Sequence, residues 1–163
     1  MLIGIEIGGT KLQACLADMD GKIVHIWRTT VNSDRQATGI RETMSASLPE
    51  LMKLVPPGQQ LAGVGVGYGG PVDAKTGKTI ISHQILGWEN FPLAEWLGQL
   101  LKSPVLVGND ADVAGLGEAT KGAGREHGIN TAVSVASRSL DAGREFTGHR
   151  QRGSLGIGCI RLA

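Results

Sequence analysis

Three short stretches of this sequence combine glycine with side chains that can bind or move charge. The first is residues 6–11, EIGGTK, in which an apolar run ends at two glycines. Without a Cβ, these glycines let backbone amides approach an anion, while Thr10 adds a hydroxyl and Lys11 a positive charge. Glu6 has the chemistry to hold a magnesium ion through water. The stretch predicts a phosphate-binding turn, although an ordinary Gly-Gly hairpin explains the same residues without a ligand.

The second stretch is residues 63–73, GVGVGYGGPVD. Its alternation of glycine and valine predicts a flat strand against which another element packs closely. The Gly69-Gly70-Pro71 segment then exposes backbone amides in a turn. A dinucleotide-binding fingerprint fits the letters, but its glycines would lie inside a strand rather than between a strand and a helix.

The third stretch is residues 105–110, VLVGND, a short strand that delivers Asn109 and Asp110 at its carboxyl end. Ligands of α/β proteins bind at such strand ends. An aspartate there can accept a hydroxyl proton while the asparagine fixes a neighbouring hydroxyl. Alternatively, Asp110 caps the helix that follows. Trp88 also allows two interpretations, because its side chain could stack on a sugar or pack within a loop.

Periodicity predicts the elements that position these stretches. Three strands at residues 2–7, 11–17 and 22–31 form a meander, with a turn at Asp18–Gly21. A helix capped at Asn32–Ser33 runs to about Val55, and Pro49 should kink or split it. Strands at 61–67 and 105–107 then alternate with helices at 91–102 and 110–120, while 68–90 is irregular.

This βββαβαβα order indicates an α/β fold of the actin-like ATPase (ribonuclease-H-like) type, a mixed sheet with helices on both faces. The 163 residues fit one domain, and the net charge of +1 gives no footprint of a nucleic-acid binder. No apolar run approaches the ~20 residues of a membrane span, and the first residues are not a signal peptide. Two cysteines are too few for a disulfide framework, so a cytoplasmic setting is expected.

The composition changes after residue 121. All seven lysines lie at or before residue 121, whereas six of the nine arginines lie after it. We therefore divide the chain into a lobe of residues 1–123 and a segment of residues 124–163. This segment is either the start of a truncated or divergent second lobe or a poorly ordered tail. The four histidines share no metal-ligand spacing, so no metal site is expected.

Taken together, four motifs resemble the repressor–ORF–kinase (ROK) family of sugar kinases. In order and spacing they are IEIGGTK (5–11), GVGVGYGGPVD (63–73), LGWENFPL (86–93) and VGNDADVAGLGEATKGAGR (107–125). The resemblance covers about residues 1–127. It implies an actin-like lobe and the ATP-dependent transfer of a γ-phosphate to a hexose hydroxyl, as in glucokinases.

The resemblance also implies roles for individual residues. Those that would meet ATP and Mg²⁺ are Glu6, Gly8, Gly9, Thr10 and Lys11. Those that would contact the sugar are Gly69, Gly70, Gln84, Asn109 and Asp110, with Asp110 as the catalytic base. Two positions depart from the family pattern, because Gly69 replaces a usual proline and Gln84 a usual asparagine.

The second segment departs further. Residues 134–143 lack the glycine run of the family's second phosphate loop, and residues 156–159 are the nearest match to its Glu-x-Gly-His motif. The chain ends before the family's cysteine-rich zinc segment, so no zinc is expected. A frameshift or a damaged gene copy would explain the arginine-rich composition and the lost loop together.

An alternative function follows from these departures, namely a non-catalytic lobe that self-associates or binds sugar weakly. Without a partner lobe and a returning C-terminal helix, apolar surface stays uncovered, so a homo-oligomer is expected. Repressor members of the family carry a DNA-binding helix-turn-helix before this lobe. Because this chain starts at the first strand, we expect no nucleic-acid partner.

Overall fold

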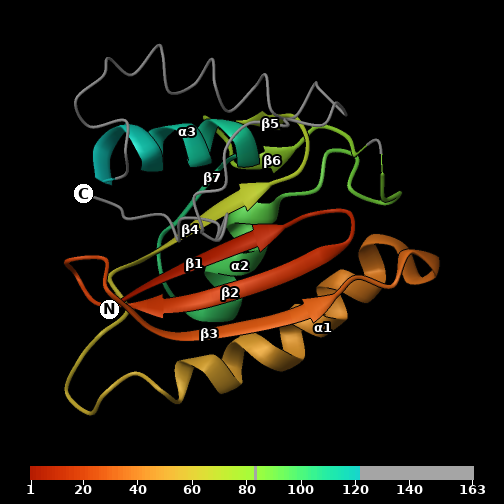
Figure 1. Ribbon diagram of the computed structural model, residues 1–163. Helices are drawn as coiled ribbons and strands as arrows, with labels where there is room; N and C mark the ends of the chain where they lie inside the picture. Colours follow the sequence, from red (N-terminus) through yellow and green to blue (C-terminus); the bar gives the residue numbers. More distant parts are fainter. Residues whose placement is uncertain (83, 122–163) are drawn as a thin grey trace, which may run out of the picture.

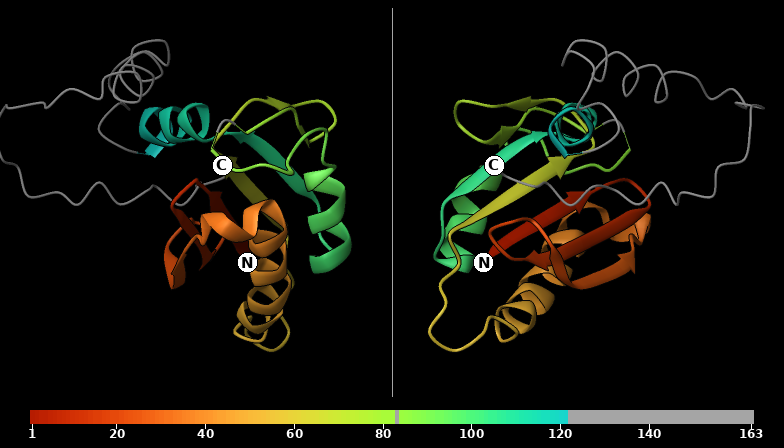
Figure 2. Two further views of the ribbon diagram at one scale, coloured as in Figure 1. Left: turned by 90° about the vertical axis from the view of Figure 1, so that its right-hand side faces the viewer. Right: turned by 60° about the vertical axis from the view of Figure 1, so that its left-hand side comes forward.

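The computed structural model describes residues 1–82 and 84–121, which build a five-stranded mixed sheet with helices on both faces (Figures 1 and 2). The strand order is β3-β2-β1-β4-β7. The strands are β1 (Leu2–Ile7), β2 (Lys11–Ala17), β3 (Ile23–Thr30), β4 (Gly63–Tyr68) and β7 (Val105–Asn109). The central strand, β1, runs antiparallel to β2 and parallel to β4.

The period of two along each strand decides which side chains enter the core. On β1, Ile3, Ile5 and Ile7 are almost fully buried on one face, which carries α1 (Gln36–Met52) and α2 (Leu93–Leu101). Leu93 and Leu97 lie one helical turn apart and are also fully buried. Each such side chain contributes roughly 1.5–3 kcal/mol by leaving water. The main core therefore lies between the sheet and these two helices.

The opposite face of the sheet carries α3 (Asp110–Lys121) close to its backbone. A Cβ added at Gly67 would lie 3.6 Å from the Asp110 Cα, and one added at Gly108 would lie 2.8 Å from a Val113 methyl. The glycines of β4 and β7 thus make room for α3, as the Gly-Val alternation predicted. Helices on both faces confirm the predicted fold class.

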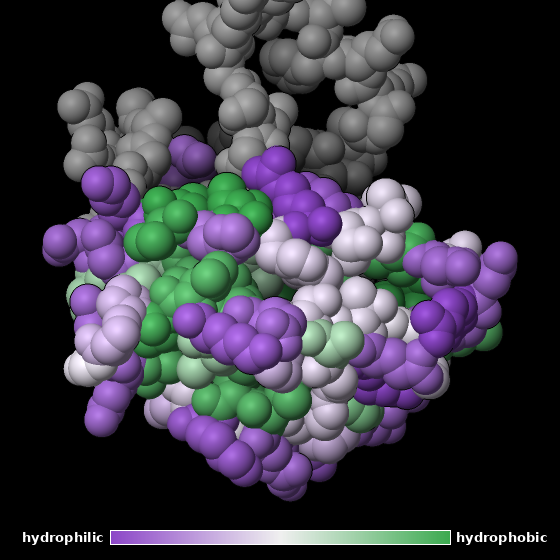
Figure 3. Space-filling model, turned by 90° about the horizontal axis from the view of Figure 1, so that it is seen from below, coloured by the Kyte–Doolittle hydropathy of each residue, from purple (hydrophilic) through white to green (hydrophobic). Residues whose placement is uncertain are grey.

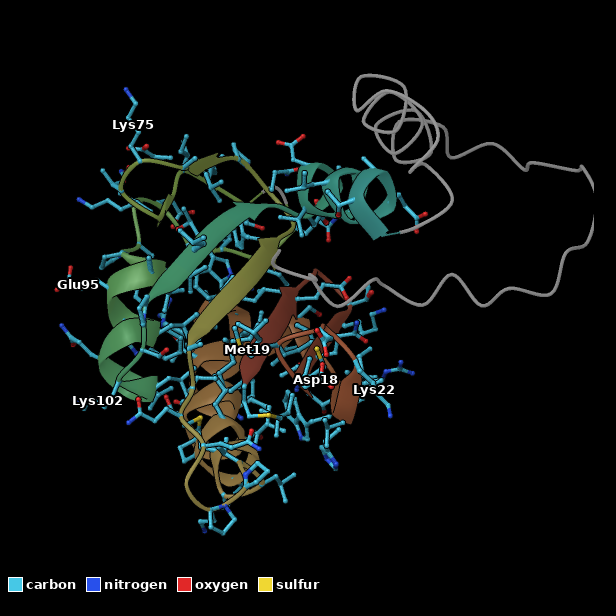
Figure 4. All side chains as sticks on the ribbon, turned by 90° about the vertical axis from the view of Figure 1, so that its left-hand side faces the viewer. Asp18, Met19, Lys22, Lys75, Glu95 and Lys102 are labelled. Atoms are coloured by element: carbon cyan, nitrogen blue, oxygen red, sulfur yellow. The ribbon has the colours of Figure 1, made fainter. Side chains whose placement is uncertain are left out.

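The turn between β2 and β3 forms from local side-chain chemistry. The Asp18 carboxylate accepts hydrogen bonds from the amides of Asp20 and Lys22, at 3.0 and 2.8 Å. Gly21 has a φ of 79°, which favours glycine. Figure 4 shows Asp18, Met19 and Lys22 together on this turn. The predicted turn signal is confirmed.

The first helix differs from its prediction at both ends. Asn32 caps only a short 3-10 helix, Ser33–Arg35, and Gln36, the first residue of α1, has a φ of 54°. The chain breaks here because Gln36 Oε1 accepts a hydrogen bond from the Leu86 amide, which belongs to a distant loop. Of the two expected effects of Pro49, a kink or a split, the split does not occur, because α1 runs through Pro49 to Met52. Pro49 leaves only the carbonyl of exposed Ser45 without its helical donor.

The segment predicted to be irregular contains a two-stranded hairpin, β5 (Val72–Asp73) and β6 (Lys78–Thr79). The Asp73 carboxylate accepts hydrogen bonds from the Lys75 amide at 2.9 Å and the Thr76 hydroxyl at 2.8 Å. These bonds lower the pKa of Asp73, the hydroxyl bond most strongly. Figure 4 shows Lys75 at the tip of this hairpin.

Trp88 is part of the core and does not offer its face to a ligand. Its side chain is 1% exposed and makes edge contacts with Tyr68 and Phe91, at ring-centroid distances of 5.7 and 5.4 Å. The Arg41 guanidinium lies over the same aromatic group, 5.4 Å from the Trp88 centroid. Of the two sequence-based interpretations, loop packing is correct.

Some apolar side chains remain on the surface. On β3, an edge strand, Ile23, Val24 and Ile26 are 40%, 58% and 43% exposed. Figure 3, seen from the side where α1 lies in Figure 1, shows several apolar areas separated by polar side chains. Among the described residues, no helix is long and apolar enough to cross a membrane. The predicted second segment, residues 124–163, lies outside the described residues.

Candidate functional site

The site lies where β1, β4 and β7 end at the same edge of the sheet. Ile7 is in register with Tyr68, and Tyr68 with Asn109. The turn after β1, the turn after β4 and the start of α3 therefore meet there, as in other α/β proteins whose parallel strands end together. The three glycine-containing stretches singled out in the sequence converge at this edge.

The Asp110 carboxylate lies beside both glycine turns. The Gly69 amide donates to the Ile7 carbonyl at 2.9 Å, which joins the turn after β4 to the end of β1. A Cβ at Gly69 would lie 3.5 Å from Asp110 Oδ2 and 3.6 Å from the Gly8 Cα. Asp110 is half-buried rather than in the core. One carboxylate oxygen therefore faces the space next to Gly8 and Gly69.

Glu6 and Lys11 form a second charged group at this edge. Lys11 Nζ lies 3.7 Å from Glu6 Oε2, an ion pair beyond hydrogen-bond distance. Burial raises the pKa of Glu6 and the nearby Asp110 carboxylate adds to the rise, while Lys11 opposes it. Glu6 Oε2 is buried and accepts no hydrogen bond. This oxygen therefore has capacity left for a donor or a hydrated cation.

Asn109 has a structural function that the sequence did not reveal. Its Nδ2 donates to the Gly70 carbonyl at 3.0 Å, and its Oδ1 accepts from the Ala111 amide at 3.0 Å. The second bond makes Asn109 the N-cap of α3, the position that the sequence assigned to Asp110 as an alternative. Asp110 Oδ1 also accepts from the Ala111 amide, at 2.8 Å, which leaves Oδ2 toward Gly69. Asn109 thus fixes Gly70 and Asp110 relative to each other.

Gln84 lies against the first glycine turn. A Cβ at Gly9 would lie 1.7 Å from Gln84 Oε1 and 3.1 Å from Gln84 Cβ, so a larger residue there would have to displace the Gln84 side chain. Thr10 is exposed at the tip of the same turn. The structure thus brings Gln84, assigned to the sugar by resemblance, into contact with the turn assigned to the nucleotide.

Sequence reasoning missed Gln13. It lies opposite Glu6 in the β1–β2 register and is 8% exposed, and its Oε1 accepts no hydrogen bond. The signal was present, because a hairpin turning at residues 8–10 pairs Glu6 with Gln13.

Within the described ranges, no three side chains of His, Cys, Asp or Glu gather to hold a metal ion.

Comparison with known proteins decides the family. A model of the ROK family matches residues 2–158. The chain belongs to the ROK family. The resemblance read from the four motifs is therefore confirmed.

Relatives within the ROK family include two bacterial glucokinases. The chain is 33% identical over 124 residues to the Halalkalibacterium halodurans glucokinase, covering 75% of this chain and 37% of that protein. It is 31% identical over 157 residues to the Thermotoga maritima glucokinase, covering 96% and 48%. The chain therefore spans less than half the length of these curated relatives.

A solved structure supports the same placement. The Streptomyces griseus ROK glucokinase, in complex with glucose and AMPPNP, matches with a TM-score of 0.64 and 32% identity. The match covers 76% of this chain and 37% of that chain. The sheet and helices described above thus have the actin-like fold of this ROK family structure.

Proposed function

We propose that this chain provides the Asp110-bearing lobe of an ATP-dependent hexose kinase, which transfers a γ-phosphate to a sugar hydroxyl. The observation that carries the proposal is the position of Asp110 Oδ2 beside Gly69 and Gly8. A half-buried carboxylate at that place can accept a proton from a hydroxyl bound at the strand ends. The similarity to glucokinases supports glucose or a related hexose as substrate.

The residues present fit a nucleotide and its magnesium ion. At Gly8 and Gly69 a Cβ would lie 3.2 and 3.3 Å from a backbone carbonyl oxygen, so both turns pack closely around their glycines. Lys11 adds positive charge beside them, and Glu6 Oε2, which accepts no hydrogen bond, fits a hydrated Mg²⁺. We propose Glu6, Gly8, Gly9, Thr10 and Lys11 as this nucleotide-binding set.

Each residue of the proposed site then has a defined task. ATP, when bound, supplies the phosphoryl group. Asp110 takes the proton of the attacking sugar hydroxyl and holds it, while Asn109 keeps the Gly70 carbonyl and the start of α3 in place. Gly69 and Gly70 are proposed on the sugar side, where a Cβ at Gly69 would lie 3.5 Å from Asp110 Oδ2. Catalysis of this kind depends mainly on positioning and electrostatics.

A second candidate function is a lobe that binds sugar or nucleotide without turnover and associates with itself. The exposed apolar residues of β3 fit self-association. A cytoplasmic setting is proposed for either function.

One experiment separates the two functions. Calorimetric titration of the 163-residue chain with MgADP and with glucose measures binding, and a coupled assay measures glucose-dependent ADP release. A glucose-dependent rate that disappears in Asp110→Asn supports the kinase. Binding without a rate above that variant supports the second function. Absence of binding to both ligands refutes both.

A further inference from the structure

Residues 85–88 of the loop that precedes α2 are held by the core and by α1. Within it, Ile85 and Trp88 are buried in the core at 3% and 1% exposure. The Leu86 amide donates to Gln36 Oε1 at 2.9 Å, and Arg41 Nη1 donates to the Gly87 carbonyl at 2.9 Å. The core and α1 therefore fix the position of the residues that directly follow Gln84.

Gln84 directly precedes these fixed residues, and its side chain packs against the turn after β1. The contact is closest at its amide oxygen, which would lie 1.7 Å from a Cβ at Gly9. The backbone amide of Gln84 donates to Ser82 Oγ at 3.3 Å, which orients the start of the side chain. The oxygen therefore occupies the place that a Cβ at Gly9 would take, against the backbone of the turn.

This orientation leaves the nitrogen of the carboxamide available. Gln84 is exposed, and no residue of the described lobe forms a hydrogen bond with its side-chain amide group. A glutamine NH₂ group carries two donors, which suit the oxygens of a phosphate. Lys11, on the same turn, supplies the positive charge that draws an anion there.

We propose that Gln84 contacts the nucleotide phosphates, with its Nε2 donating to a phosphate oxygen held by the Gly8–Lys11 turn. This inference rests on the proposed function, because it presumes that the turn binds a nucleotide. It moves Gln84 from the sugar side, where the family resemblance put it, to the phosphate side. Gly9 is then a glycine for two reasons, the close approach of an anion and the space taken by Gln84.

The test uses three substitutions in the 163-residue chain. Gln84→Glu keeps the length of the side chain but replaces the donor with a negative charge. Gln84→Met keeps the approximate volume of the side chain but has neither the hydrogen-bond donor nor a negative charge. Gln59→Glu is the matched control, since Gln59 is exposed in the loop that leads into β4, at the opposite end of the sheet. Calorimetry with MgADP and, separately, with glucose gives the two dissociation constants of each protein, and thermal unfolding verifies that each is folded.

Gln84→Glu should weaken MgADP binding about tenfold or more, because a carboxylate a few ångströms from phosphate repels it. Gln84→Met should weaken it by a smaller factor, while glucose affinity and the control stay within about twofold. If Gln84 only supported the fold, the MgADP affinities of Gln84→Glu and Gln84→Met would not differ in this way.

Two results overturn the inference and are distinct from each other. If Gln84→Glu leaves MgADP binding unchanged or weakens glucose binding instead, Gln84 is not a phosphate contact, although the proposed function stands. If the unsubstituted chain does not bind MgADP, the proposed nucleotide site itself fails, and the inference fails with it.

Discussion

Replacing Asn109 with alanine should destabilise the lobe even when no ligand is present. The substitution removes the N-cap of α3, which is worth about 1 kcal/mol, and the bond to the Gly70 carbonyl, worth about 1 kcal/mol more. Together the two losses amount to about 2 kcal/mol. In a chain of this length that corresponds to a fall in Tm of about 4–8 °C.

A second substitution divides this effect between the two bonds. Asn109→Ser keeps an oxygen that can cap α3 but is too short to reach the Gly70 carbonyl. Its loss should therefore be about half that of Asn109→Ala. Urea denaturation followed by far-ultraviolet circular dichroism gives both values, with Gln59→Ala as a control on an exposed side chain.

Two outcomes would show that this account of Asn109 is wrong. If Asn109→Ala unfolds at the same urea concentration as the original chain, the two bonds contribute nothing to stability. If Asn109→Ser loses as much as Asn109→Ala, the cap is irrelevant and only the link to Gly70 counts. The first result would leave Asn109 with a role in ligand binding alone, and the second would leave it with the Gly70 link but no capping role.

Three further predictions concern the rest of the lobe. Burial raises the pKa of Glu6, so the folded chain binds this proton more tightly than the unfolded chain does. The free energy of unfolding therefore falls as the pH rises from about 4.5. Glu6→Gln should raise the urea midpoint at pH 7 and leave it unchanged at pH 4. Gly70→Ala should cost roughly 1–3 kcal/mol because its Cβ would lie 2.7 Å from a carbonyl oxygen, whereas Gly117→Ala, in open space on α3, should be neutral or stabilising in the same assay. Light scattering at tens of micromolar should show a dimer or larger species that Val24→Lys with Ile26→Lys shifts toward monomer, and a monomer before substitution would contradict this.

The elements of this lobe were largely predictable because their signals are local. The alternation of Ile3, Ile5 and Ile7 with small or polar residues defines both the strand and its buried face. The break before α1 was not predictable, because it depends on a hydrogen bond between Gln36 and Leu86, which are far apart in sequence. Strand β7 extends to Asn109 for a similar reason, since its partner β4 continues to Tyr68.

The candidate site was predictable in its members but not in their contacts. The glycine turns and the strand end at Asp110 follow from motif spacing, and the parallel register brings them to one edge. The packing of Gln84 on Gly9 depends on how a loop of the chain is anchored by Ile85 and Trp88. Hydrophobic periodicity cannot predict this contact, because Gly9 and Gln84 both lie in loops outside any helix or strand.

The central position of β1 has a consequence for how this lobe folds. The antiparallel β1–β2–β3 meander joins neighbours in sequence and can form early, since its loops are short. Pairing Leu2 with Gly63 must close a much longer segment, and β7 can add only after that. The two glycine turns and Asp110 thus come together only in the last, slowest step. In stopped-flow refolding we expect secondary structure to appear before MgADP binding, and simultaneous recovery would argue against this order.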